Sequence, residues 1–254
     1  MSGPALHPQL TWRDGALGCD VRGAAVRFTG RAGGVSRGPY ASLNLGSWTD
    51  DDPAAVRENR RRLAALADVG PERLAQAHQV HGIDVLAVVG DAHLPGPELE
   101  RVRDADGAAT SLPATPCVVL CADCLPVALV AEDAVAMVHA GWRGLVGGVL
   151  ESGVARLREV GGTGAITAVV GPGAGPCCYE VGDEVHAALA PLGTAVRHGA
   201  HADLPAAAEL RLRAAGVAEV LQSGRCTICE PDRWFSHRRD AGRTGRQAGI
   251  AWLR

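Results

Sequence analysis

The chain has 254 residues, of which 47% are hydrophobic and 21% are charged, and its formal net charge is −3. A chain of this kind buries a full hydrophobic core, and these proportions exclude a disordered protein. All 25 of its Lys+Arg residues are arginine, and they form no basic block. A nucleic-acid-binding stripe is therefore not indicated.

Export and membrane insertion are not indicated either. The first 18 residues lack the charged-then-apolar order of a signal peptide. The most apolar stretch, residues 117–131, is interrupted by Asp123 and Pro126 and is too short to span a bilayer. We therefore expect a cytoplasmic protein whose eight cysteines are reduced thiols. Three of them are interpreted by default as small core residues: Cys19, Cys117 and Cys177.

In chain order, the first predicted element is a helix that begins after Asp52. Asp52 is a capping residue, Pro53 suits the first helical position, and Gly70 ends the segment. Arg60 to Arg62 fall largely on the face opposite the apolar residues, so we interpret them as a solvated helix face. The apolar face carries Val56, Leu63 and Leu66.

The rest of the chain alternates between predicted strands and helices. Short β-branched apolar runs indicate buried strands at residues 85–89, 118–121, 127–130, 135–138 and 166–170. Length and period predict helices at residues 145–160, 180–192 and 204–215, the last capped by Asp203. Two further strands are predicted at residues 217–221 and 249–253. The alternation favours an α/β (mixed α+β) fold, with one domain over residues 1–254 and a mixed β-sheet flanked by helices.

A candidate active-site segment follows the strand that is predicted to end at His139. The sequence His139-Ala-Gly-Trp-Arg-Gly144 is a turn that leads into a helix at about Leu145. Catalytic side chains favour such strand-to-helix junctions. The first turn of a helix offers free N–H groups to an anion, and Arg143 adds a forked donor that matches phosphate.

A second candidate is Cys121-Ala-Asp-Cys124, which follows another predicted strand. A zinc ribbon needs a further C-x-x-C pair at short range, but the one at residues 226–229 lies about a hundred residues away. A redox motif would begin a helix, whereas Pro126 forces the preceding residue into extended geometry. Residues three apart in an extended chain point to opposite faces, so at most one of the two cysteines enters a site. Cys124, further from the apolar run, is the better candidate.

A third candidate is the turn His78-Gln-Val-His81, in which the sequence alone leaves either histidine open. Together the three segments supply two histidines and one cysteine from separate loops. Catalytic zinc takes three protein ligands, and two histidines with one cysteine are an accepted set. The same ligands would also suit copper.

These segments belong to a longer series of motifs that runs from about Gly33 to the C-terminus. The series is SLNLG (42–46), QVHG (79–82), ADCLP (122–126), HAGWRG (139–144), GP (171–172), YEVG (179–182), FSHRRD (235–240) and TGR (244–246). It resembles the laccase-domain family, also called the polyphenol oxidase or YfiH-type family.

The resemblance implies a mixed α/β domain with zinc, rather than copper, bound by His81, Cys124 and His139. Members of the family are similar to purine nucleoside phosphorylases, which cleave adenosine, inosine and methylthioadenosine with phosphate, and they also deaminate adenosine. One bacterial member is known as a peptidoglycan editing factor. The expected partners are therefore purine nucleosides and phosphate, and the sequence does not indicate an oligomeric state.

The chain departs from the family pattern at three places. Gly30, before Arg31, replaces the usual threonine, His237 replaces the usual tyrosine, and Gly173 replaces an apolar residue. The first two departures bear on substrate specificity, so Arg31 is a candidate substrate contact.

Further roles follow from the two reactions. Deamination needs a proton shuttle, for which Asp123 or Asp106 is the candidate. Phosphorolysis needs phosphate held against the anomeric carbon, and we assign this to Arg143 with Arg238 as a second clamp. The predicted catalytic set is thus Cys124, His139, Arg143 and Asp123. For Arg238 a surface ion pair is an equal alternative. Asn44 is a candidate contact to ribose or base, and stabilising a turn is an equal alternative for it.

Three other functions compete with this one. A multicopper oxidase is rejected because no two of the nine histidines are separated by a single residue, and because Met1 and Met137 are the only methionines for an axial copper ligand. A cysteine hydrolase or transferase would use Cys124 as nucleophile and His139 as base, without stoichiometric metal. A non-catalytic factor would bind a cell-wall precursor or a protein without turnover.

Overall fold

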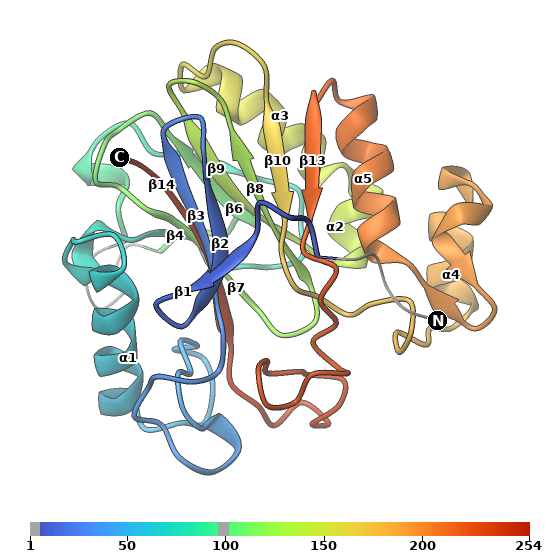
Figure 1. Ribbon diagram of the computed structural model, residues 1–254, viewed down its shortest axis with the longest axis horizontal. Coiled ribbons are helices and arrows are strands. Elements are labelled where there is room, and N and C mark those ends of the chain that lie inside the picture. The colour runs from blue at the N-terminus through green and yellow to red at the C-terminus, as the bar shows by residue number, and fades with distance from the viewer. Residues whose placement is uncertain (1–5, 96–101) are drawn as a thin grey trace.

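The structure is a computed structural model that describes residues 6–95 and 102–254. Met1 lies outside these residues. Within them the chain forms four layers, namely helix α1, two packed β-sheets, and a group of helices on the far side (Figure 1). The predicted mixed α/β class is confirmed, but the strands are divided between two main sheets instead of one.

The first sheet lies beside α1. Its strands, in spatial order, are β1 (Thr11–Arg13), β2 (Ala16–Val21), β3 (Ala24–Thr29), β14 (Gln247–Leu253), β7 (Cys117–Cys121) and β4 (Ala75–Gln76). The β4–β7 pair is parallel and the other pairs are antiparallel. The last strand in sequence therefore lies in the middle of the sheet, between β3 and β7.

The second sheet lies between the first sheet and the remaining helices. Its strands are β13 (Glu219–Gln222), β10 (Thr167–Val170), β8 (Leu125–Val130), β9 (Val135–Ala140), β6 (Gly107–Thr110) and β5 (Leu86–Ala87). The β10–β13 and β5–β6 pairs are parallel. A separate two-stranded ribbon joins β11 (Arg197–His198) and β12 (His201–Ala202).

The helices cover the two outer faces of the sheets. They are α1 (Pro53–Ala65), α2 (Trp142–Gly147), α3 (Val149–Glu159), α4 (Asp183–Leu189) and α5 (Leu204–Ala214). Short 3-10 turns lie at Gly38–Tyr40, Pro71–Arg73, Asp91–His93, Ala190–Leu192 and Thr194–Val196. In the described part of the chain, no helix combines the length and apolar character needed to cross a membrane.

Three apolar clusters hold the layers together. Phe28, Val119 and Met137 belong to the cluster between the two sheets, and Leu63 lies in the cluster between α1 and the first sheet. The largest cluster packs the second sheet against α2, α3 and α5. Because both faces of each sheet are covered, the central strands are nearly continuous apolar runs, as the sequence indicated.

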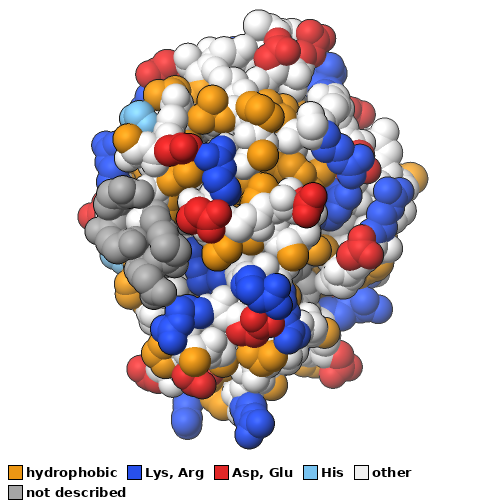
Figure 2. Space-filling view, turned by 90° about the vertical axis from the view of Figure 1, so that its left-hand side faces the viewer, with side chains coloured by type: hydrophobic (Ala, Val, Ile, Leu, Met, Phe, Trp, Pro, Cys, Tyr) orange, Lys and Arg blue, Asp and Glu red, His pale blue; other side chains and the backbone are white. Residues whose placement is uncertain are grey.

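Helix α1 begins as predicted, since the Asp52 carboxylate accepts a hydrogen bond from the N–H of Ala54 at 2.9 Å. The interpretation of Arg60 as solvated is wrong. Arg60 is buried, and its guanidinium donates to Gln76 Oε1 at 2.6 Å. Arg61 and Arg62 do face solvent, where both pair with Glu58. On the α1 side of the molecule, basic and acidic side chains are interspersed rather than gathered in a stripe (Figure 2).

The helix predicted at residues 145–160 is two helices. It breaks at Gly148, whose φ of 103° lies in the left-handed region, between α2 and α3. A glycine adopts this conformation at little cost, and the Gly147-Gly148 pair is the local signal for the break. The sequence analysis expected an anion site at the start of a long helix. This expectation loses support, because α2 has only 6 residues.

Candidate metal centre and active site

The hairpin of β8 and β9 places two of the candidate ligands side by side. Leu125 pairs with Ala140, and Pro126 pairs with His139. Cys124, the residue before β8, therefore lies at the same end of the hairpin as His139. His139 is buried and Cys124 is half-buried.

Cys121, by contrast, ends β7 and belongs to the core between the sheets. The prediction assumed an extended chain between the two cysteines. The structure shows a turn there instead, because the backbone of Asp123 has a φ of 94°. The Asp123 carboxylate holds this turn, accepting from Thr227 Oγ1 at 2.6 Å and from the N–H of Arg238 at 2.7 Å. The structure thus places Cys124, and not Cys121, beside His139, and the reason is a turn rather than strand parity.

Asp106, just before β6, positions the loop that carries His81. Its buried carboxylate accepts the N–H groups of Val80, His81 and Gly82 at 3.2, 2.9 and 2.6 Å. The same carboxylate lies 2.8 Å from Nδ1 of His139. Asp106 therefore orients two histidines at once, and this leaves Nε2 of His139 for the site.

His81, Cys124 and His139 converge, with their candidate ligand atoms all within 4.8 Å of one another. Cys124 Sγ lies 3.8 Å from His81 Nε2, and the two imidazole rings are 4.9 Å apart. Gly141 keeps the space open, because a Cβ there would lie 2.9 Å from His81 Cδ2 and 3.1 Å from Cys124 Sγ. The number and chemistry of the donors fit a catalytic transition-metal site. His78, the alternative histidine, pairs with Asp104 instead.

The pKa values of Cys124 and His139 are both shifted strongly from their ordinary values. Burial raises the pKa of Cys124, but the charge of His139 and hydrogen bonds from His139 and His81 outweigh it and lower the pKa to about 6. Burial lowers the pKa of His139, yet the Cys124 thiolate and the bond to Asp106 raise it to about 9. Burial likewise raises the pKa of Asp106, but bonds from His139, Gly82 and Val80 hold it below its ordinary value.

The three candidate ligands lie on the wall of a cavity of about 420 Å³. This volume lies within the range of small-molecule sites, about 300–1,000 Å³. Three arginines, Arg143, Arg238 and Arg246, also line the cavity. Its aromatic and remaining polar lining includes Trp48, Gln79, Trp142, Tyr179 and His237.

Arg143 and Arg238 reach the cavity from different elements. Arg143, at the start of α2, lies 4.3 Å above the Trp142 ring and 3.8 Å from a Glu184 carboxylate oxygen, and its side chain is 59% exposed. Arg238 lies 5.0 Å above the Tyr179 ring and donates to the carbonyl of Glu180.

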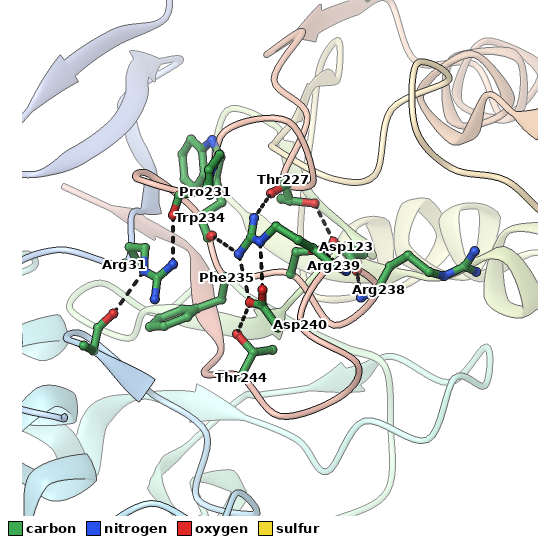
Figure 3. A network of polar contacts seen from close by, with 12 residues as sticks. Arg31, Asp123, Thr227, Pro231, Trp234, Phe235, Arg238, Arg239, Asp240 and Thr244 are labelled. Carbon is green, nitrogen blue, oxygen red and sulfur yellow. Dashed lines mark hydrogen bonds and ion pairs between the residues drawn. The ribbon is translucent and has the colours of Figure 1, made fainter. Parts of the chain in front are cut away.

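Asn44 and Arg31 do not line the cavity. Asn44 is fully buried, and its Oδ1 accepts the N–H groups of Gly46 and Arg246, both cavity residues. Asn44 therefore stabilises its own turn, as the alternative role predicted, and also joins this turn to the distant segment of Arg246. Arg31 donates to the carbonyls of Ala41 and Pro231 and stacks on Phe235, so its guanidinium serves the backbone of the loops (Figure 3).

Asp123 lines the cavity, but both of its oxygens are already bonded, as Figure 3 shows for Thr227 and Arg238. Neither Asp106 nor Asp123 thus has an oxygen without a partner. Sequence reasoning missed Arg246, which is mostly buried beside the site. Burial lowers its pKa, against the opposing charges of Cys124 and Asp123. Arg246 belongs to the TGR motif, to which the sequence analysis assigns no function, because no local pattern indicates that β14 begins next to the cavity.

Comparison with known proteins identifies the chain's relatives. The model of a family described as multi-copper polyphenol oxidoreductase laccase matches residues 25–254. The chain belongs to this family. The resemblance of its motifs to the laccase-domain family is thereby confirmed, and the match covers every residue of the candidate site.

The relatives of this chain carry a different activity in their names. A protein of Escherichia coli named purine nucleoside phosphorylase YfiH is 39% identical over 241 residues, covering 91% of this chain and 95% of that protein. A purine nucleoside phosphorylase of Pseudomonas aeruginosa is 40% identical over 236 residues, covering 89% and 91%. The crystal structure of YlmD from Geobacillus stearothermophilus superposes with a TM-score of 0.88 at 34% identity, covering 99% of this chain and 100% of that one.

Proposed function

We propose that this chain is a zinc-dependent purine nucleoside phosphorylase that acts on adenosine, inosine and methylthioadenosine and also deaminates adenosine. The observation that carries the proposal is the convergence of His81, Cys124 and His139 on a cavity lined by three arginines. The names of the relatives support the same reaction class. The proposal includes a cytoplasmic location, in which the eight free cysteines stay reduced.

Zinc is the proposed metal because two imidazoles and one thiolate form a set that leaves a coordination position open. Bound there, zinc would supply Lewis acidity and activate water. Copper is the less favoured ion. The described methionine, Met137, is buried between the sheets and does not line the cavity, so no axial methionine ligand is present among the described residues.

The arginines are assigned to phosphate. In phosphorolysis a phosphate oxygen bonds to the anomeric carbon while the bond from that carbon to the base nitrogen breaks, and the base keeps the electron pair. Arg143 and Arg238 both line the cavity, and each offers a forked donor for the phosphate. Arg246, which also lines the cavity, adds a positive charge that is mostly buried.

The aromatic lining is assigned to the nucleoside. Trp48, Trp142 and Tyr179 provide flat apolar surfaces that suit a purine. Asp123 was predicted as a proton shuttle, but we now assign it a positioning role because its carboxylate is engaged by Thr227 and Arg238. His237, at the position where the family has tyrosine, is a cavity residue, which supports a role in specificity.

The experiment is to incubate the purified protein with inosine or adenosine, with and without phosphate, and to identify the products by chromatography. Free base and ribose-1-phosphate should form only with phosphate, and inosine should form from adenosine. His81→Ala should lower turnover more than about 100-fold, beyond the loss usual for a metal-orienting partner. Binding of nucleosides without any turnover would favour a non-catalytic factor.

A cysteine hydrolase or transferase is the second candidate, and a specific arrangement favours it. Cys124, His139 and Asp106 stand in the order of a nucleophile, the histidine that activates it and the carboxylate that orients this histidine. Metal dependence separates the two functions. Full turnover of nucleosides by chelator-treated, metal-free protein would favour the cysteine hydrolase or transferase.

A further inference from the structure

Four cysteines outside the candidate active site form a second cluster. Cys177 and Cys178 lie in the loop between β10 and α4, and Cys226 and Cys229 lie in the segment after β13. Their four sulfur atoms are all within 4.8 Å of one another. The C-x-x-C pair at residues 226–229, too distant in sequence to serve Cys121 and Cys124, thus meets a different pair.

Backbone pairing brings the two segments together. Gly173 and Cys226 form a parallel bridge, in which the N–H of Thr227 donates to the carbonyl of Gly173 at 2.9 Å. The N–H of Gly175 donates to Cys226 Sγ at 3.3 Å, which stabilises a thiolate. A Cβ at Gly175 would lie 3.4 Å from Cys177 Sγ, so a glycine suits this close approach.

We propose that Cys177, Cys178, Cys226 and Cys229 bind a second, structural zinc ion. Four thiolates close the coordination of zinc and leave no position for substrate, which is the pattern of a structural site. Cys229 Sγ lies 3.3 Å from Cys177 Sγ and 2.8 Å from Cys178 Sγ. Tetrahedral zinc with sulfur ligands at about 2.3 Å requires sulfurs about 3.8 Å apart, so each of these two distances needs to lengthen by at most about 1 Å.

This assignment corrects the interpretation of Cys177 as a core residue. Cys177 and Cys178 are half-buried and Cys229 is exposed, so burial does not explain them. A disulfide between two of these residues would require an oxidant, whereas zinc binds the reduced thiolates directly and releases their protons.

The cluster adjoins the wall of the active-site cavity. Tyr179 follows Cys178 directly and stacks under Arg238. Thr227, inside the C-x-x-C pair, donates to Asp123, and its carbonyl accepts from Arg239 (Figure 3). A zinc ion here would fasten the loop of Tyr179 to the segment of Arg238, and so hold one side of the cavity in place. The assignment does not depend on which reaction the cavity supports.

Metal analysis of the intact protein is the direct test. The native chain, purified under reducing conditions, should contain two zinc ions per chain. Cys226→Ser combined with Cys229→Ser should contain one, and so should Cys124→Ser, because each removes a different site. Cys19→Ser, a change at a buried cysteine outside both clusters, is the matched control and should keep two.

A spectroscopic measurement covers the case in which the double variant does not fold. Cobalt bound to the Cys124→Ser protein should show the intense absorption of a tetrahedral thiolate site, and X-ray absorption of its zinc should show sulfur ligands at about 2.3 Å. A single zinc ion in the native chain that disappears entirely in Cys124→Ser would overturn the proposal. So would a disulfide among the four cysteines in protein kept under reducing conditions, detected by mass spectrometry after alkylation.

Discussion

A single carboxylate, Asp106, organises the candidate metal centre at the residue scale. It receives three consecutive backbone N–H groups and also bonds to His139, so the positions of both candidate histidine ligands depend on it. Sequence reasoning considered Asp106 only as a proton shuttle. Its position just before β6, beside β9, depends on a pairing of strands that no local pattern reveals.

Asp106→Asn tests this role. The amide keeps the shape but removes the charge and turns one acceptor into a donor that faces backbone N–H groups. We expect metal affinity to fall about 10–100-fold, the usual effect of losing a partner that orients a ligand. Metal titration by competition with a chelator measures it. Asp104→Asn, which affects the exposed partner of His78, is the matched control and should leave the affinity unchanged.

The pKa of Cys124 gives a second prediction at this scale. Because the pKa is lowered from 9.0 to about 6, the thiolate of the metal-free protein should persist as the pH falls and disappear only near that value. Alkylation of Cys124 by iodoacetamide, followed by mass spectrometry across pH, should therefore reach half its maximal rate at about pH 6. His139→Asn should move this midpoint upward. A midpoint near 9 in the unaltered protein would contradict the ion pair.

At the element scale, close approach between elements shapes the site. Gly141 lies between β9 and α2, where any side chain would meet His81 and Cys124, two of the candidate ligands. Gly141→Ala should therefore lower metal affinity and turnover while the fold is kept. Gly182→Ala is the control, since a Cβ there meets nothing within 4 Å. Equal metal affinity in the two variants would show that the space at Gly141 is not required.

Helix α1 gives a prediction about stability. Arg60→Ala removes a buried guanidinium and leaves Gln76 Oε1 without this donor, so we expect the free energy of unfolding to fall by about 1–3 kcal/mol. Arg61→Ala, on the exposed side of the helix, should change it by at most about 0.5 kcal/mol. Urea denaturation of both variants measures the difference. Equal free energies of unfolding would show that the buried Arg60 contributes no more to stability than the solvated Arg61.

Some elements were predictable and others were not. Continuous apolar runs predicted β7 to β10, and capping residues predicted α1 and α5. Strands β1 to β3 were missed because glycine, arginine and aspartate interrupt their apolar pattern. A signal was nevertheless present, since Asp14-Gly15 forms a two-residue hairpin turn with both φ values positive. Contacts between residues that are far apart in the sequence, such as those of Arg246 and the four cysteines, cannot be predicted from a local pattern.

At the scale of the whole molecule, β14 links distant parts of the chain. It lies between β3 and β7, so the C-terminal strand is held by pairs from the first third and the middle of the sequence. The two sheets share one apolar cluster. We therefore propose that the chain is a single domain, as the sequence analysis expected.

This proposal predicts one cooperative unfolding transition. The near-ultraviolet and far-ultraviolet circular dichroism of the metal-loaded protein should follow the same denaturant curve, because loss of either sheet exposes their common core. Two transitions that separate with denaturant concentration would instead indicate two domains.

We propose, above all, that His81, Cys124 and His139 hold the metal on which phosphorolysis depends. Its most direct test is to remove metal with a chelator, return zinc stepwise, and follow phosphate-dependent release of hypoxanthine from inosine. We expect no release without metal, recovery as zinc fills the site, and no recovery in Cys124→Ala. Undiminished release by the metal-free protein, or full recovery in Cys124→Ala, would contradict it.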